Sequence, residues 1–151
     1  MTEIASLAAR VRQLEDQVAV ADAARRIGWL IDNGTVAELR ACLATDAVIE
    51  SLTPGGEIRN RYEGEDDLQR YCAQVTAASS RPKMHVIMII SARVSGDTAD
   101  VIAYYVRLSS PQGEPQLAAY GHYYDTFRRD REQWVLARRQ AVRTVSLASY
   151  K

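Results

Sequence analysis

Two residues of this sequence could together move a proton, namely His85 and Asp32. His85 opens a run rich in β-branched residues, and alternation along a strand puts it on the same face as Ile87. Asp32 ends a helical pattern, directly before an Asn-Gly pair. If the fold joins them, the carboxylate would fix the imidazole tautomer and raise the basicity of its second nitrogen. Composition leaves another interpretation open, in which each is only a polar residue at the end of its own element.

Three predicted helices precede His85, and the first of them must position Asp32. Apolar residues recur every three or four positions over residues 4–31, which predicts one amphipathic helix that ends near Asp32. Thr35 begins a second helix that ends near residue 45, because a Glu follows it at the spacing of a capping box. Residues 65–79 form the third helix, with acidic side chains in its first turn.

The remaining segments are predicted to be strands. Two short strands lie among the helices, at residues 47–52 and 59–64, and four long ones follow at residues 84–94, 99–108, 117–129 and 133–146. This order predicts an α+β fold in which the helices cover one face of a curved, largely antiparallel sheet. Nothing in the sequence divides the chain, so residues 1–151 are expected to form one domain.

The composition excludes several classes of protein. Nineteen basic and nineteen acidic side chains give a formal net charge of zero, without the basic block of a nucleic-acid-binding protein. No apolar run reaches the roughly 18 to 20 residues that span a bilayer, and the N-terminus lacks a secretory pattern. The two cysteines suit neither a disulfide framework nor a zinc site. We therefore expect a cytoplasmic protein with no metal, no cofactor, no nucleic-acid partner and no membrane segment.

Several short segments, taken in order, resemble the SnoaL-like branch of the nuclear transport factor 2-like superfamily. None is specific alone, but their order and spacing extend over residues 5–145. They are Leu14-Glu15-Asp16, Leu30-Ile31-Asp32-Asn33-Gly34, Leu43-Ala44-Thr45-Asp46-Ala47-Val48, Tyr62-Glu63-Gly64, Met84-His85, Val94-Ser95-Gly96-Asp97-Thr98-Ala99, Gly121-His122-Tyr123-Tyr124-Asp125-Thr126-Phe127-Arg128-Arg129 and Trp134-Val135-Leu136-Ala137-Arg138-Arg139. Proteins of this branch resemble scytalone dehydratase, the hexachlorocyclohexane dehydrochlorinase and the bile-acid 7α-dehydratase.

The resemblance implies a cone-shaped fold, with a curved sheet and three N-terminal helices around a deep apolar pocket. It places Asp32 and His85 on the two positions of the family's catalytic pair. It thereby implies a cofactor-independent lyase, dehydratase-like, or an isomerase. The expected substrate is a small hydrophobic cyclic molecule of steroid, polyketide or terpenoid type, from which His85 removes a proton.

Four further residues are candidates for substrate binding. Tyr123 and Arg139 match pocket positions of the family, and Arg139 is expected to be a lone cation that suits an oxyanion, a leaving group or a carboxylate. A surface position beside Arg138 remains an alternative for that arginine. Tyr105 and Trp29 are expected either to line the pocket or to fill the core. His122 alternates with Tyr123 and is expected to point out of the cone.

Two departures from the family pattern keep other functions open. Ile27 and Ser51 stand where dehydratases of the group carry polar catalytic helpers. The chain could therefore be a non-catalytic small-ligand-binding protein or subunit. A polyketide-cyclase activity is a third possibility, because it would use the same pair and differ only in what the base deprotonates.

Apolar side chains are also predicted on the outer side of the sheet, where a monomer would be polar. They are Val86, Met88 and Ile90 on one strand, with Tyr120, His122 and Tyr124 on another. Exposed patches of this kind mark interfaces, so we expect a homodimer, with a trimer as the alternative. The apolar stripe from Ile4 to Val18 either adds a second contact or packs on its own domain.

Overall fold

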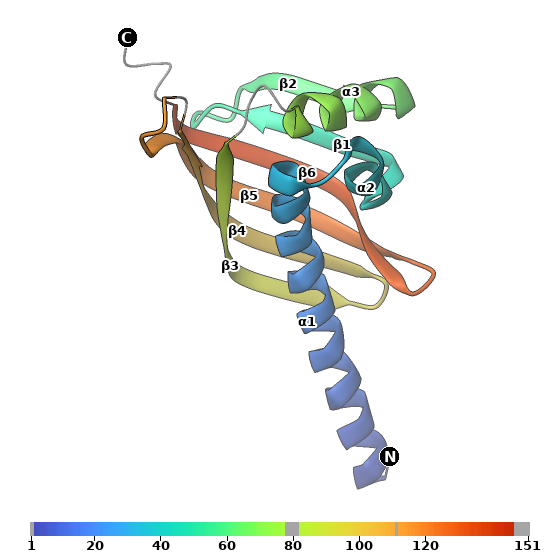
Figure 1. Cartoon of the computed structure of the whole chain (residues 1–151). Helices are drawn as coiled ribbons and strands as arrows, with labels where there is room; N and C mark the ends of the chain where they lie inside the picture. The colour runs from blue at the N-terminus through green and yellow to red at the C-terminus, as the bar shows by residue number, and fades with distance from the viewer. Residues whose placement is uncertain (1, 78–81, 111, 147–151) are drawn as a thin grey trace.

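The computed structural model describes residues 2–77, 82–110 and 112–146 of the chain (Figure 1). Its elements are α1 (Glu3–Asn33), α2 (Val36–Ala41), β1 (Leu43–Leu52), β2 (Ile58–Glu63), α3 (Glu65–Thr76), β3 (Lys83–Ser95), β4 (Thr98–Ser109), β5 (Gln116–Asp130) and β6 (Gln133–Ser146). The predicted α+β fold of three helices against one curved sheet is confirmed. The main differences are at the second helix and the first strand, because α2 ends at Ala41 and β1 already begins at Leu43, where it pairs with Leu136 of β6.

The described strands form one mixed sheet with the order β2-β1-β6-β5-β4-β3. Strands β3 to β6 form an antiparallel meander, as the sequence predicted. β1 joins this meander parallel to β6, and β2 folds back antiparallel on β1. β3, which carries His85 near its start, is therefore an edge strand of the sheet.

The helix α1 has two halves with different surroundings. Its second half crosses the inner face of the sheet and buries Val20, Ala24 and Ile27 there, whereas its first half extends past the sheet (Figure 1). The apolar stripe from Ile4 to Val18 is exposed, so it does not pack on its own domain. No helix in the described part of the chain is long and apolar enough to cross a membrane.

The inner face of the sheet changes character along each strand. At one end its side chains enter the main hydrophobic core with α1 and α3, as Val101 and Phe127 do. Tyr105, two residues after Ala103 on β4, and Tyr123, two residues before Asp125 on β5, form a separate buried cluster with Ala119. The helices thus fill one end of the concave face and leave the other end for a cavity.

Gly121 allows β5 and β6 to approach closely beside this cavity. The pairing of the two strands shifts at this residue, and a Cβ placed there would lie 2.0 Å from the carbonyl oxygen of Val142. It would also lie 3.0 Å from a ring carbon of Tyr105. A side chain at residue 121 therefore forces both the backbone and the cavity wall to move.

Gly121→Ala is expected to destabilise the fold by about 1–3 kcal/mol, since overpacking of a well-packed site has that cost. Urea unfolding followed by circular dichroism measures the change in the free energy of unfolding. Gly55→Ala is the matched control, because the nearest atom to its added Cβ is Thr53 Oγ1 at 3.7 Å. Equal midpoints for the two variants would show that the close approach at Gly121 is not required.

Candidate active site

A cavity of about 590 Å³ lies between the inner face of the sheet, the end of α1 and the helix α3. Its lining is aromatic and aliphatic with several basic side chains, and it consists of Ile31, Ile49, Glu50, Ser51, Asn60, Tyr62, Tyr71, Gln74, Val75, Pro82, Lys83, His85, Tyr105, Arg107, Ser109, Ala119, Tyr123, Arg139, Ala141 and Arg143. Asn60, Gln74 and Pro82 are exposed and mark the side that opens to solvent. The volume is in the range of small-molecule sites.

Asp32 and His85 are in direct contact at the edge of this cavity. Oδ1 of Asp32 lies 2.6 Å from Nδ1 of His85, and Oδ2 accepts the backbone N–H of the same residue at 2.5 Å. The two side chains are only 7% and 10% exposed. A carboxylate accepts hydrogen bonds, so Nδ1 carries the hydrogen and Nε2 is the nitrogen left for the cavity.

The local sequence explains how these two residues meet. Gly28 lies one turn before Asp32 on the same side of α1, and a Cβ there would lie 2.7 Å from Cγ1 of Ile87. The absence of a side chain lets α1 approach β3 closely at that point. Ile87 and His85 share one face of β3, so the next turn of the helix brings Asp32 to the imidazole. Gly34 ends α1 with its N–H bonded to the carbonyl of Leu30.

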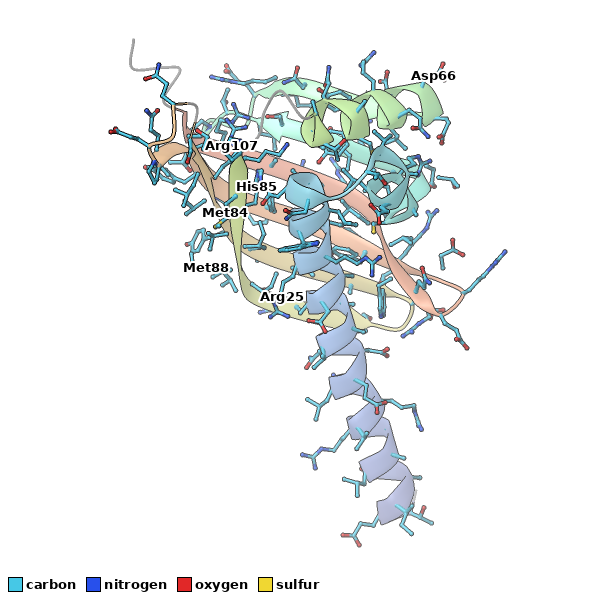
Figure 2. All side chains as sticks on the ribbon, viewed as in Figure 1. Arg25, Asp66, Met84, His85, Met88 and Arg107 are labelled. Carbon is cyan, nitrogen blue, oxygen red and sulfur yellow. The ribbon has the colours of Figure 1, made fainter. Side chains whose placement is uncertain are left out.

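Figure 2 shows His85 between β3 and the end of α1, with Arg107 close by. Met84 and Met88 lie on the other side of the same strand, as the alternation of β3 requires (Figure 2). The edge strand therefore presents the imidazole to the cavity and methionine side chains to the opposite face.

Arg139 lines the cavity but is not a lone cation, which corrects our expectation. Its Nε and Nη2 donate to both carboxylate oxygens of Asp125 at 2.8 and 2.6 Å. The side chains of Arg139 and Asp125 are 3% and 1% exposed. Burial alone would lower the pKa of Arg139, but Asp125 holds the pKa above its usual range. The charge of this arginine is thus neutralised within the protein.

Two tyrosines form an aromatic wall next to this ion pair. The rings of Tyr105 and Tyr123 are stacked, with centroids 4.5 Å apart and planes inclined by 11°. The guanidinium of Arg139 lies over the Tyr123 ring, 4.0 Å from its centroid. Burial raises the pKa of both phenols, although nearby arginines oppose the shift. Both hydroxyls therefore stay protonated and can donate hydrogen bonds.

Trp29 is not part of the site. Its side chain is 66% exposed and lies outside the cavity lining. The reason is the rotation of about 100° per residue along a helix, since Gly28 faces the sheet and Trp29 is turned away from it. His122 lies on the outer face as expected, with the rings of Tyr104 and Tyr124 edge-on to it.

Sequence reasoning did not single out four charged residues of the lining, namely Glu50, Lys83, Arg107 and Arg143. Arg107 and Arg143 could have been found, because each lies two residues after an inward-facing residue of its strand, Tyr105 and Ala141 respectively. Residues two apart on a strand share one face. Glu50 is 1% exposed, with its carboxylate held by Arg61 and by two side chains of β6. Burial opposes ionisation of Glu50, but these hydrogen bonds lower its pKa. No pattern along β1 signals this burial, since the partners come from other strands.

The described residues contain no group of three or more histidine, cysteine, aspartate or glutamate side chains arranged to hold a metal ion. What the cavity does offer is an imidazole oriented by a carboxylate, two protonated phenols and several guanidinium groups. Such groups can accept a proton and stabilise a developing negative charge.

Solved structures with a similar fold come from Novosphingobium aromaticivorans. A nuclear transport factor 2-like protein with a cystatin-like fold has a TM-score of 0.76 at 24% identity, covering 95% of this chain and 91% of that one. The beta subunit of a candidate aromatic-ring-hydroxylating dioxygenase has 0.74 at 18% identity, with coverages of 95% and 93%. A candidate scytalone dehydratase has 0.72 at 21% identity, with coverages of 87% and 86%.

No curated protein sequence matches the chain. At identities below 25%, the solved structures show a common fold and do not assign an activity. The sequence itself gives the family, because residues 12–140, most of the chain, match the SnoaL-like domain. This match shows that the chain belongs to the SnoaL-like family.

Proposed function

We propose that this protein is a cofactor-independent lyase or isomerase that removes a proton from a small hydrophobic cyclic molecule. The observation that supports this most is the contact of Asp32 with His85 at the wall of an aromatic-lined cavity. Asp32 is absent from the lining and acts through His85, whose ring it orients and whose positive charge it stabilises. His85 is the group that meets the substrate.

The reaction begins when Nε2 of His85 takes a proton from a carbon next to a carbonyl group. The electron pair of the broken C–H bond moves toward the carbonyl oxygen, and the phenols of Tyr105 and Tyr123 donate hydrogen bonds to that oxygen. In an elimination, the pair then forms a C=C bond as a β-hydroxyl leaves with the proton from His85, as water. In an isomerisation, His85 returns the proton to a different carbon.

Deuterium exchange tests this proposal without knowledge of the natural substrate. A panel of cyclic ketones and β-hydroxyketones is incubated with the protein in D₂O, and mass spectrometry follows deuterium incorporation and loss of water. We expect exchange into at least one ring ketone, abolished in His85→Ala. Exchange that survives in His85→Ala, or no exchange above the buffer rate anywhere in the panel, would reject a base at this position.

A non-catalytic subunit is the second candidate, and the beta-subunit neighbour favours it. The residue types at two positions also fit it, since Ile27 is buried in the core and Ser51 lines the cavity where relatives carry polar helpers. A protein of this kind would bind hydrophobic molecules and exchange none of them. The same deuterium experiment therefore separates the two candidates.

We also propose that the protein pairs with a second copy through the outer face of the sheet. This face carries exposed large apolar side chains on three adjacent strands: Met84, Val86, Met88, Ile90, Ile102, Tyr104, Tyr120 and Tyr124. Charged side chains are rare among these positions, which is typical of the core of an interface between copies.

Light scattering at micromolar concentration is expected to give about twice the chain mass of 16.8 kDa. Met88→Asp is expected to shift the protein to a monomer, because a carboxylate at the centre of an apolar interface loses its water. Ile58→Asp is the control, since Ile58 is similarly exposed but lies on β2, at the opposite edge of the sheet from β3. A monomeric parent protein would contradict this pairing.

A further inference from the structure

Two guanidinium groups of the cavity have no acidic partner among the residues that the structure describes. We propose that the cavity binds molecules that carry a carboxylate, which Arg107 and Arg143 hold beside His85. The inference rests on the proposed function in one respect, namely that the same cavity holds the molecule on which His85 acts.

The contacts around the cavity show which acidic side chains already have a partner. Asp125 pairs with Arg139, Glu50 pairs with Arg61 and Arg138, and Asp32 is bonded to His85. Each of these three acidic side chains thus has its own partner. An additional cation in the lining has to find its counterion elsewhere.

Arg107 and Arg143 are such cations. In the described part of the chain neither makes a salt bridge, and the Nε atom of each is shielded from water without a hydrogen-bond partner. The guanidinium of Arg143 also interacts with the phenol of Tyr105, whose pKa it lowers against the effect of burial. A shielded guanidinium N–H without a partner is costly, and an incoming anion would remove that cost.

The strand register brings the two guanidinium groups to one place. Arg107 lies directly across from His85 on β4, and Arg143 lies across from Gly121 on β6. Only β5 separates their strands, and their pairing partners Ala119 and Gly121 are two residues apart along it, so the two Cα atoms are about 12 Å apart at the usual strand spacing and rise. Between them β5 carries Ala119, whose short side chain leaves space in the cavity, whereas the ring of Tyr105 packs against Gly121. Two long side chains can converge on one anion in that space.

A carboxylate fits this arrangement better than a neutral group. Guanidinium groups bind planar carboxylates through paired, charge-assisted hydrogen bonds. The adjoining wall of Tyr105 and Tyr123 is aromatic and suits the hydrophobic body of the same molecule. The expected ligand is therefore a ring compound with one carboxylate, anchored near Arg107, with a ring C–H near Nε2 of His85.

A matched pair of probes tests the charge requirement directly. Calorimetry compares 2-naphthoate with 2-naphthamide, which has nearly the same shape and no charge. We expect naphthoate to bind at least tenfold more tightly, and added salt to weaken only naphthoate. Equal affinities for the two probes, or no binding of naphthoate, would overturn the proposal.

Substitutions then locate the anion. Arg107→Gln and Arg143→Gln are each expected to weaken naphthoate binding about tenfold and to leave naphthamide binding unchanged, whereas Arg107→Lys keeps part of the preference. Arg93→Gln is the control, because Arg93 is an exposed arginine of β3 outside the cavity. Melting curves establish that each variant is folded. Full naphthoate affinity in both glutamine variants would place the anion elsewhere and reject this site.

The outcome for the anion and the outcome for the base can be told apart. His85→Gln is expected to retain the preference for naphthoate, since its binding depends on the arginines. A charge preference without deuterium exchange would leave the anion site standing and remove the proposed catalysis. Exchange into neutral ketones without any preference for naphthoate would support the proposed catalysis and reject the anion site.

Discussion

His85→Gln is expected to slow deuterium exchange into a reactive ring ketone by about 10²- to 10⁴-fold, the usual contribution of a general base. Glutamine has a volume similar to that of histidine and can form hydrogen bonds in the same place, but it has no basic nitrogen. The rate constants of exchange at saturating ketone, measured by mass spectrometry for parent and variant, give the ratio directly.

Asp32→Asn is expected to have an effect of about 10²-fold or more by a different route. An amide in place of the carboxylate neither compensates a protonated imidazole nor requires the hydrogen to reside on Nδ1. His122→Gln is the control, because it removes the second histidine of the sequence from a position outside the cavity. If His122→Gln slowed exchange as much as His85→Gln, the assignment of the base would be wrong.

Asp125→Asn is expected to lower the free energy of unfolding by about 3–5 kcal/mol, which is the usual cost of breaking a buried ion pair. The carboxylate accepts two hydrogen bonds from Arg139, and both side chains are buried. The substitution leaves the buried guanidinium over the Tyr123 ring without its counterion. Urea unfolding monitored by circular dichroism measures the loss.

The control for this prediction is Asp100→Asn, an exposed aspartate that accepts one hydrogen bond from Thr126. Its midpoint is expected to stay close to that of the parent. The double variant Asp125→Leu with Arg139→Met is expected to recover most of the lost stability, because apolar side chains can replace a buried pair. If Asp125→Asn and Asp100→Asn unfolded at the same midpoint, the buried ion pair would contribute little to the free energy of unfolding.

Local patterns in the sequence predicted where Asp32 and His85 lie, at the end of a helix and at the start of a strand. That the two residues meet, and that Tyr123 faces the pocket, was predicted only from the resemblance to the family. The position of Trp29 was missed because the stripe that identifies α1 as a helix does not fix which side of its last turns faces the sheet. That rotation is set by packing, in particular by the close approach at Gly28.

The partner of Arg139 was missed because of a shift in strand pairing. Counting back along the β5–β6 hairpin from the Asp130–Gln133 pair would place Asp125 opposite Arg138, on the outer face. A bulge between Thr126 and Phe127 moves the register by one residue, so that Asp125 lies opposite Arg139 instead. A single inserted residue thus decides whether a buried arginine is compensated, and a one-residue slip leaves no clear signal in the sequence.

The second hydrogen bond of Asp32 has a consequence for the boundary of the sheet. β3 has a neighbouring strand on one side only, and an edge of this kind leaves backbone N–H groups free to join strands of other molecules. At His85 the donor is taken by Oδ2 of Asp32, so a helix side chain occupies the place that an additional strand would take. The carboxylate that orients the imidazole therefore also protects an open edge from unwanted strand addition.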